Sequence, residues 1–288
     1  MKSGRGGDAG DESAAGKPRW REDALEVEDD ELAESFDRSV EEGATRLSRP
    51  FPNLVATGLM AGIDVGFGVL ALIFVLNETG SESAAGLAFT VGFFALHLGR
   101  SELFTENFFL PVTTVITGKG TLLQLFRLWF GTYITNLMGG WLVAAMLIVA
   151  YPGLEDTAVG LGESIISQGV TAESFMLAVL AGAAITLMTW MVRNAESEFG
   201  ELLAVAAFGF LLGATKMNHV VVISIKMFTA LQVGETDYGY VDWLRLSSWS
   251  ALGNMVGGLG LVTVLRLVQI GRPHIERRKR TPLRRRSS

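Results

Sequence analysis

Long apolar stretches separated by short polar segments make up most of the chain between residues 50 and 271. Because about 20 apolar residues cross the hydrocarbon core of a bilayer as a helix, this pattern predicts an all-α membrane protein with six spans. The second and fifth stretches are too long and too polar for simple helices, so we expect both to be broken. The six stretches are Leu54–Leu76, Ala85–Ile116, Leu128–Ala150, Phe175–Arg193, Leu202–Leu231 and Trp249–Ile270.

A short motif occurs twice in the chain. Asn-Leu-Met-Gly-Gly begins at Asn136, and Asn-Met-Val-Gly-Gly begins 118 residues later, at Asn254. The same offset moves the first apolar stretch onto the fourth, and the polar interruption near Glu102 to a point beside His219. It therefore predicts two related halves of three spans, each with one broken span, an arrangement that points to a permeation site. The glycines alone favour a simpler reading, close packing of helices.

Charged residues gather at the two ends of the chain. Residues 1–49 contain 14 acidic and 8 basic residues and few aromatic ones, a composition that predicts a mostly disordered tail. A helix lying along the membrane is also possible there, because helical spacing aligns Leu32, Phe36, Val40 and Ala44. Residues 50–271, the predicted membrane domain, hold only 8 of the 24 lysines and arginines.

The basic residues also predict the orientation. Residues 272–288 carry eight lysines and arginines, so the positive-inside rule places this tail in the cytoplasm, and six spans place the N-terminal tail there too. The net charge of −6 comes from the acidic tail and the predicted outer loops, which argues against nucleic acid as a partner. The basic tail suits anionic lipid. With no cysteine and three histidines, we expect no thiol chemistry, metal or cofactor.

The interruption of the second span carries three charges, on Arg100, Glu102 and Glu106. A charge on a lipid-facing helix in mid-membrane costs about 2.5–3.5 kcal/mol, so these side chains must face protein, water or one another. A buried pair of Arg100 with one of the glutamates would explain them. Thr105 differs, because a hydroxyl can both donate to and accept from a passing solute while remaining neutral.

The interruption of the fifth span contains Lys216, Asn218 and His219. A lone histidine on an apolar face is usually packed and satisfied. The repeat, however, pairs this position with the break in the first half, which favours a function. Imidazole is also the side chain that exchanges a proton most readily near neutral pH.

At these residues the chain resembles the formate/nitrite transporter family. The first signature of the family is close to Glu-Leu-Phe-Thr-Gly-Asn, and residues 102–107 read Glu-Leu-Phe-Thr-Glu-Asn. The second signature places one histidine in the break of the fifth span, where His219 stands. The Gly-Asn-x-x-Gly-Gly of the last span is matched at residues 253–258.

The resemblance implies an aquaporin-like protomer, with two inverted three-helix repeats, assembled as a pentamer in the plasma (inner) membrane of a prokaryote. Each protomer would have one pore for small monovalent anions of weak acids or for their protonated forms. Thr105 and His219 would face each other in the pore, and His219 would give a proton or hydrogen bond to the anion. Leu103 and Phe104 would narrow the pore, with Asn218 beside the histidine. Supporting polar residues near the breaks would be Arg100, Glu102, Glu106, Asn107 and Lys216.

Several positions depart from the family pattern and leave the substrate open. Glu106 replaces a small residue, Asn218 stands where an acidic residue is common, and an asparagine of the fourth span would fall at about Gly182. One alternative is a non-transporting membrane scaffold in which Lys216 and Glu106 pair and plug the pore. Another is a pore for neutral solutes, although the Asn-Pro-Ala motifs of aquaporins are absent. The chain lacks His-Glu-x-x-His and Gly-x-Ser-x-Gly, so an enzyme is not expected.

Overall fold

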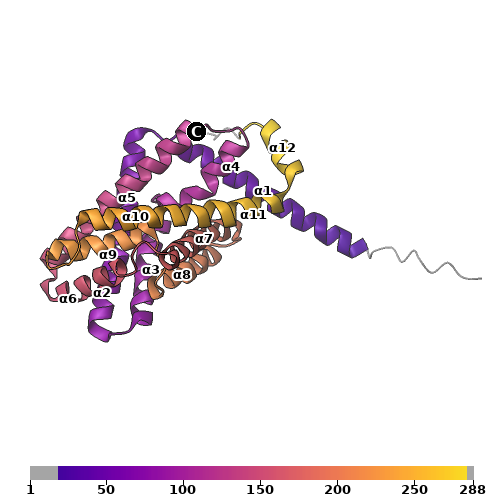
Figure 1. Cartoon of the computed structure of the whole chain (residues 1–288). Coiled ribbons are helices and arrows are strands. Elements are labelled where there is room, and N and C mark those ends of the chain that lie inside the picture. Colours follow the sequence, from indigo (N-terminus) through magenta and orange to yellow (C-terminus); the bar gives the residue numbers. More distant parts are fainter. Residues whose placement is uncertain (1–18, 284–288) are drawn as a thin grey trace, which may run out of the picture.

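The computed structural model describes the backbone of residues 19–283 and the side chains of residues 31–283, and over this range it contains helices and no strand. The long helices lie side by side, and the N-terminal helix projects from one end (Figure 1). Four helical segments of the described chain are long and apolar enough to cross a membrane: α2 (Phe51–Thr79), α5 (Leu122–Ala150), α7 (Ala172–Asn194) and Tyr240–Ile270. The last consists of α10 (Tyr240–Met255), the π-helical η3 (Val256–Thr263) and α11 (Val264–Ile270).

The two stretches that the sequence predicts to be broken are both interrupted. At the first break Arg100 has a φ of 54°, which helical backbone does not accommodate. At the second, His219 ends the loop and caps the next helix, where its Nδ1 accepts a hydrogen bond from the backbone N–H of Val222 at 3.4 Å. The resulting pieces are α3 (Glu82–Leu98), η1 (Phe104–Phe108) and α4 (Leu110–Ile116) in one stretch, and α8 (Glu198–Ala214) and α9 (Val220–Val233) in the other.

The glycines of the repeated motif allow helices to touch, as the simpler reading of the motif predicts. A Cβ on Gly139 of α5 would overlap the carbonyl oxygen of Leu59 in α2. In the second half, a Cβ on Gly257 would overlap the carbonyl oxygen of Val179 in α7. Small residues thus bring α2 against α5 and α7 against η3.

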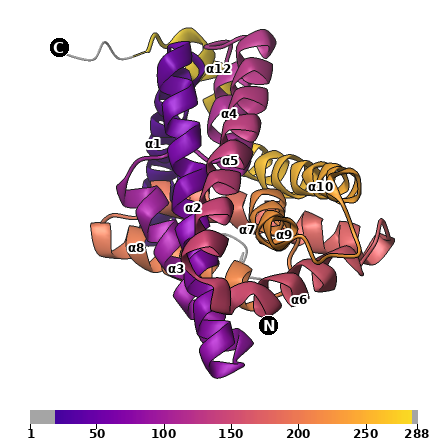
Figure 2. The same ribbon diagram turned by 90° about the vertical axis from the view of Figure 1, so that its left-hand side faces the viewer.

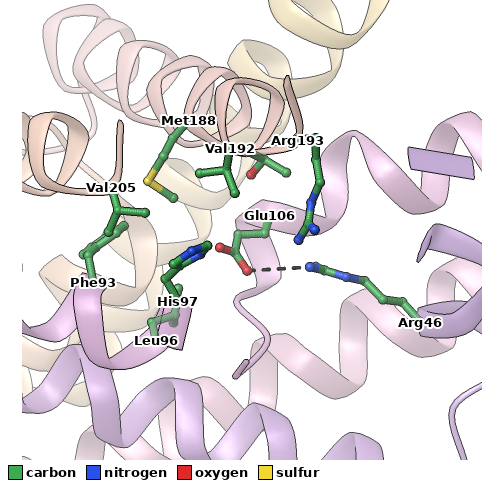
Figure 3. A pocket seen from close by; sticks show the side chains of 10 residues that line it. Arg46, Phe93, Leu96, His97, Glu106, Met188, Val192, Arg193 and Val205 are labelled. Carbon is green, nitrogen blue, oxygen red and sulfur yellow. Dashed lines mark ion pairs between the residues drawn. The ribbon is translucent and has the colours of Figure 1, made fainter. Parts of the chain in front are cut away.

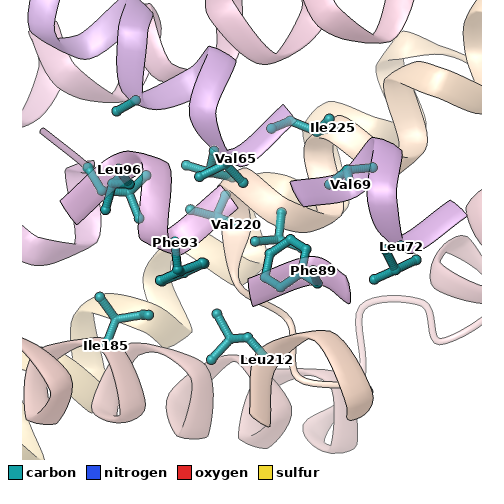
Figure 4. Packing of buried hydrophobic residues seen from close by; sticks show 14 of the residues in the cluster. Val65, Val69, Leu72, Phe89, Phe93, Leu96, Ile185, Leu212, Val220 and Ile225 are labelled. Carbon is teal, nitrogen blue, oxygen red and sulfur yellow. The ribbon is translucent and has the colours of Figure 1, made fainter. Parts of the chain in front are cut away.

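An apolar core surrounds the breaks (Figure 4). Phe89 and Phe93 of α3 pack in it with Val65 of α2, Leu212 of α8 and Val220 of α9, all buried. A short helix, α6 (Glu155–Ile166), follows the turn η2 (Pro152–Leu154) in what the sequence predicts as an outer loop, and packs against α9 (Figure 2). The core therefore holds elements of both halves around the two interruptions.

The N-terminal region differs from the prediction of a mostly disordered tail over residues 1–49. Residues 1–18 lie outside the described residues, but α1 (Arg19–Leu47) is helical. Its apolar side packs on the rest of the protein rather than along a membrane. The free energy gained by burying a few large apolar side chains is enough to dock the helix, although most residues of the tail are polar. The buried cluster consists of Phe36, Val40, Phe109, Leu110, Trp190 and Ile270.

Truncating Phe36 should release α1 from the rest of the protein. Phe36 is 1% exposed, and removing a buried phenylalanine side chain typically costs about 3–5 kcal/mol. We expect Phe36→Ala to accelerate amide hydrogen exchange of residues 31–47 by at least tenfold, because a peripheral helix opens locally. The exposed Glu31 supplies the control, Glu31→Ala. Equal exchange in the two variants would show that the cluster does not hold α1.

The C-terminal basic region also begins as a helix, α12 (Arg272–Arg280), that is attached to α1. Arg278 is 2% exposed and lies 3.2 Å from carboxylate oxygens of both Asp37 and Glu41. The other basic residues of α12 are exposed. Contact of those residues with anionic lipid stays a prediction.

Candidate functional site

The two interruptions meet at Thr105 and His219. The Oγ1 of Thr105, in η1, lies 2.7 Å from Nε2 of His219, and both side chains are fully buried. The residues are 114 positions apart in the chain. The structure therefore brings together the two side chains that the sequence singles out.

The hydrogen bonds of His219 indicate which way the proton points. Its Nδ1 accepts from the backbone N–H of Val222, so in the neutral imidazole Nε2 carries the hydrogen and donates to Thr105 Oγ1. Among the described residues, none accepts the hydroxyl hydrogen of Thr105. The pair therefore leaves one O–H donor for a solute, in an otherwise apolar surrounding.

Asn136 of α5 fixes the backbone of the first break. Its side-chain amide donates to the carbonyl oxygens of Gly58 (2.9 Å) and Glu102 (3.0 Å). Its carbonyl oxygen accepts from the backbone N–H of Phe104 at 2.8 Å. Asn136 is fully buried, so its three hydrogen bonds satisfy backbone groups that water does not reach.

Asn254 fixes the second break by the same set of contacts. Its amide donates to the carbonyl oxygens of Ala178 (2.8 Å) and Asn218 (2.9 Å), and its oxygen accepts from the N–H of Val220 at 2.9 Å. Asn254 therefore fixes the backbone on both sides of His219, as Asn136 fixes it on both sides of Leu103. The asparagines of the repeated motif are positioning residues for the breaks, a role that the sequence analysis did not recognise.

The charges at the first break have different partners from those expected. Arg100 is exposed and makes none of the ion pairs of the described chain, so the expected pair with a glutamate is wrong. Glu102 and Glu106 are instead paired with cations at and just after the end of α1. Glu102 contacts Arg49 and lies 3.6 Å from Arg46, and Glu106 lies 3.9 Å from Arg46.

Arg46 is the centre of this buried charge cluster. It also bonds to Glu42 at 2.9 Å and to the side-chain oxygen of Asn107 at 3.1 Å. Burial raises the pKa of Glu42, but the nearby Arg46 and Arg193 more than offset this, so its pKa lies below the ordinary 4.5. The N-terminal region expected to be a free tail thus supplies the cations that neutralise the first break.

Lys216 does not plug the protein. It is exposed, whereas Glu106 is half-buried and pairs with Arg46, so the pairing expected in the scaffold alternative is wrong. The physical reason is that Glu106 already pairs with Arg46, while the loop after α8 directs Lys216 to the surface.

Two recesses reach residues beside the two breaks. The first, here called the Arg46 recess, has an open volume of about 310 Å³, solvent at its mouth included, and lies toward the C-terminal end of α3 and the N-terminal part of α8. In it the carboxylate of Glu106 lies between His97 and Arg46 (Figure 3). The His97 imidazole is 3.0 Å from Glu201. The lining residues are Arg46, Phe93, Leu96, His97, Glu106, Met188, Thr189, Val192, Arg193 and Val205.

The second, here called the Lys226 recess, lies at the opposite ends of α3 and α8 and has an open volume of about 630 Å³. Its polar lining residues are Glu82, Ser164, Gln168, Thr215, Lys216, Asn218 and Lys226. Thr105 is one residue from Glu106 in the first recess, and His219 is one residue from Asn218 in the second. Each recess therefore reaches a chain neighbour of one member of the hydrogen-bonded pair.

The remaining predicted residues lie in the core near the pair. Leu103 is fully buried, and Phe104 packs edge to face on Phe108 and Tyr133, with ring centroids 5.0 and 5.1 Å away. Their narrowing of a pore stays a prediction. At Gly182 a side chain would overlap the backbone of Asn254, which explains why an asparagine is not found there.

Comparison with known proteins reveals relatives over most of the chain. The formate/nitrite transporter pattern matches residues 33–268. The inner membrane protein YfdC of Escherichia coli (strain K12) is 24% identical over 249 residues, which cover 83% of this chain and 79% of YfdC. A solved structure described as an FNT family ion channel has a TM-score of 0.73 at 20% identity, covering 80% of this chain and 96% of its own. A pentameric formate channel with formate bound has a TM-score of 0.61 at 18% identity, covering 75% and 95%.

The matched residues run from α1 through α11 and include both breaks. They contain the Thr105–His219 pair and both asparagines that hold the interruptions. The two solved structures share the helical fold. The chain therefore belongs to the formate/nitrite transporter family, whose members are membrane channels and transporters.

Proposed function

We propose that the protein conducts small monovalent anions of weak acids, such as formate or nitrite, or their protonated forms, through one pathway in each protomer. The pathway joins the Arg46 recess to the Lys226 recess and passes the Thr105–His219 pair. The observation that carries this proposal is the 2.7 Å hydrogen bond between two fully buried polar side chains from the two breaks.

The pair suits an anion because it offers a donor where the surroundings are apolar. His219 Nε2–H donates to Thr105, and the Thr105 O–H is then directed to the solute. A hydrogen bond to a charged group contributes about 1.5–3 kcal/mol. Leu103 and Phe104 provide the apolar constriction, which excludes hydrated ions, while a neutral weak acid crosses at lower desolvation cost.

The wider architecture in this proposal is six spans in two inverted repeats. The matching contacts of Asn136 and Asn254 support the repeat, and the apolar half-helices α3 and α9 supply parts of the second and fifth spans. Both termini would be cytoplasmic, in the inner membrane of a prokaryote. The similarity to a pentameric formate channel supports five copies, which mass measurement in detergent can test, with a monomer or tetramer as the contrary result.

Flux into liposomes tests the proposed function directly. We expect purified protein to speed the entry of formate, nitrite or another small monocarboxylate at least tenfold over protein-free vesicles, and glycerol to remain at the background rate. Glycerol flux alone would favour a pore for neutral solutes. Absence of flux for every solute of the panel would favour a scaffold.

A further inference from the structure

Lys226 is a buried lysine and the one charged residue of α9. It lies in α9, two turns beyond His219, and is 9% exposed. Within the described chain, no carboxylate oxygen lies within 4.0 Å of its ammonium nitrogen. Removing a cation from water without a close partner is costly, so a lysine at this position calls for an explanation.

Lys226 lines the recess that bears its name. The Lys226 recess contains the amide groups of Asn218 and Gln168, which are bonded to each other at 2.7 Å, and the hydroxyl of Ser164. Two further charged groups line it, Glu82 at the start of α3 and the exposed Lys216. Glu82 is the carboxylate that acts on Lys226 electrostatically, from beyond ion-pair distance.

We propose that the Lys226 recess is a carboxylate-binding site, separate from the Thr105–His219 pair, in which the Lys226 ammonium binds the carboxylate of a small monocarboxylate. The proposal deepens the function proposed above and rests on it for the class of solute. The side chains of Ser164 and Gln168 line the same recess, which is open to solvent and can admit a solute as small as acetate. Glu82 competes with the solute for the ammonium.

Binding of acetate to the intact protein in detergent tests the proposal without relying on flux. Saturation-transfer NMR should report acetate binding to the wild type and at least a tenfold weaker affinity for Lys226→Met, because the charged partner of the carboxylate is lost. Lys226→Arg should retain most of the binding. Lys279→Met, which removes an exposed lysine of α12 outside the recess, is the matched control and should bind as the wild type does.

Glu82→Gln separates a binding site from a structural ion pair. If Glu82 competes with acetate, the variant should bind acetate more tightly than the wild type. If Lys226 and Glu82 only stabilise each other, Glu82→Gln and Lys226→Met should lower the unfolding temperature alike, and acetate affinity should not change in either. That second result, or wild-type affinity in a folded Lys226→Met, would overturn the proposal.

The outcome also separates this site from the proposed function. Suppose that flux depends on His219, and that Lys226→Met changes neither flux at any acetate concentration nor acetate binding. That result would reject only the recess site. Acetate binding that depends on Lys226 in a protein that conducts no solute would reject transport and retain the site.

Discussion

Replacing His219 with phenylalanine should lower anion flux at least tenfold and leave the fold nearly intact. Phenylalanine has similar bulk but lacks both nitrogens, so Thr105 loses the group that directs its O–H to the solute. Loss of a hydrogen bond to a charged group costs about 1.5–3 kcal/mol, and every 1.4 kcal/mol is a factor of ten. Initial rates of formate entry into liposomes over a range of pH measure the effect, and circular dichroism checks the fold.

Thr105→Val tests whether the two side chains act as a unit. Valine keeps the volume of threonine and removes the hydroxyl, so it should lower flux as much as His219→Phe. Flux in the double variant should then be no lower than in either single variant, because the effects of substitutions within one hydrogen-bonded unit do not add. Lys216→Met is a control outside the pair. Unchanged flux in His219→Phe at every pH, with a conducting wild type, would reject a role for the histidine.

The second large effect is expected at the asparagines of the repeat. Asn254→Leu keeps the approximate size of the side chain but leaves the loop carbonyl of Asn218 and the N–H of Val220 without a partner, and it removes the contact to Ala178 in α7. Each unsatisfied buried group costs about 1–3 kcal/mol, so the loss for these two groups should be about 2–6 kcal/mol. We expect a lower unfolding temperature, and lost flux in whatever fraction stays folded, because the neighbours of His219 are no longer fixed.

Asn136→Leu provides the matched variant in the other half. Its three hydrogen bonds correspond one by one to those of Asn254, so the two stability losses should be similar. The exposed Asn53 offers a control, Asn53→Leu, for the change in side-chain type alone. An unfolding temperature of Asn254→Leu equal to that of Asn53→Leu would show that the hydrogen bonds of Asn254 do not hold the break.

Much of the fold can be predicted from the sequence because its signals are local. Apolar runs of about 20 residues mark the helices that can cross a membrane, and polar residues in the middle of Ala85–Ile116 and Leu202–Leu231 mark the two breaks. The repeated motif marks two asparagines, Asn136 and Asn254, that make matching contacts at the two breaks. The pairing of Thr105 with His219 followed from those breaks together with the family resemblance.

The partners of the charges could not be predicted in the same way. The sequence shows that charges at mid-membrane depth must be neutralised, but it does not indicate which residue neutralises each of them. The nearest cation along the chain, Arg100, faces outward, and Arg46 and Arg49 reach Glu102 from more than 50 positions away. The average composition of the first 49 residues also concealed the few apolar side chains that dock α1.

The sequence alone therefore determined where the long apolar helices form, where two apolar stretches are interrupted, and which polar residues stand at the interruptions, since each depends on neighbours within a few turns. Only the tertiary structure decided that Asn136 and Asn254 hold the breaks, that Arg46 and Arg49 supply the cations for Glu102 and Glu106, and that Lys226 lines a recess. These contacts join residues far apart in the chain, and the close approach of helices at glycines such as Gly139 and Gly257 fixes which side chains meet.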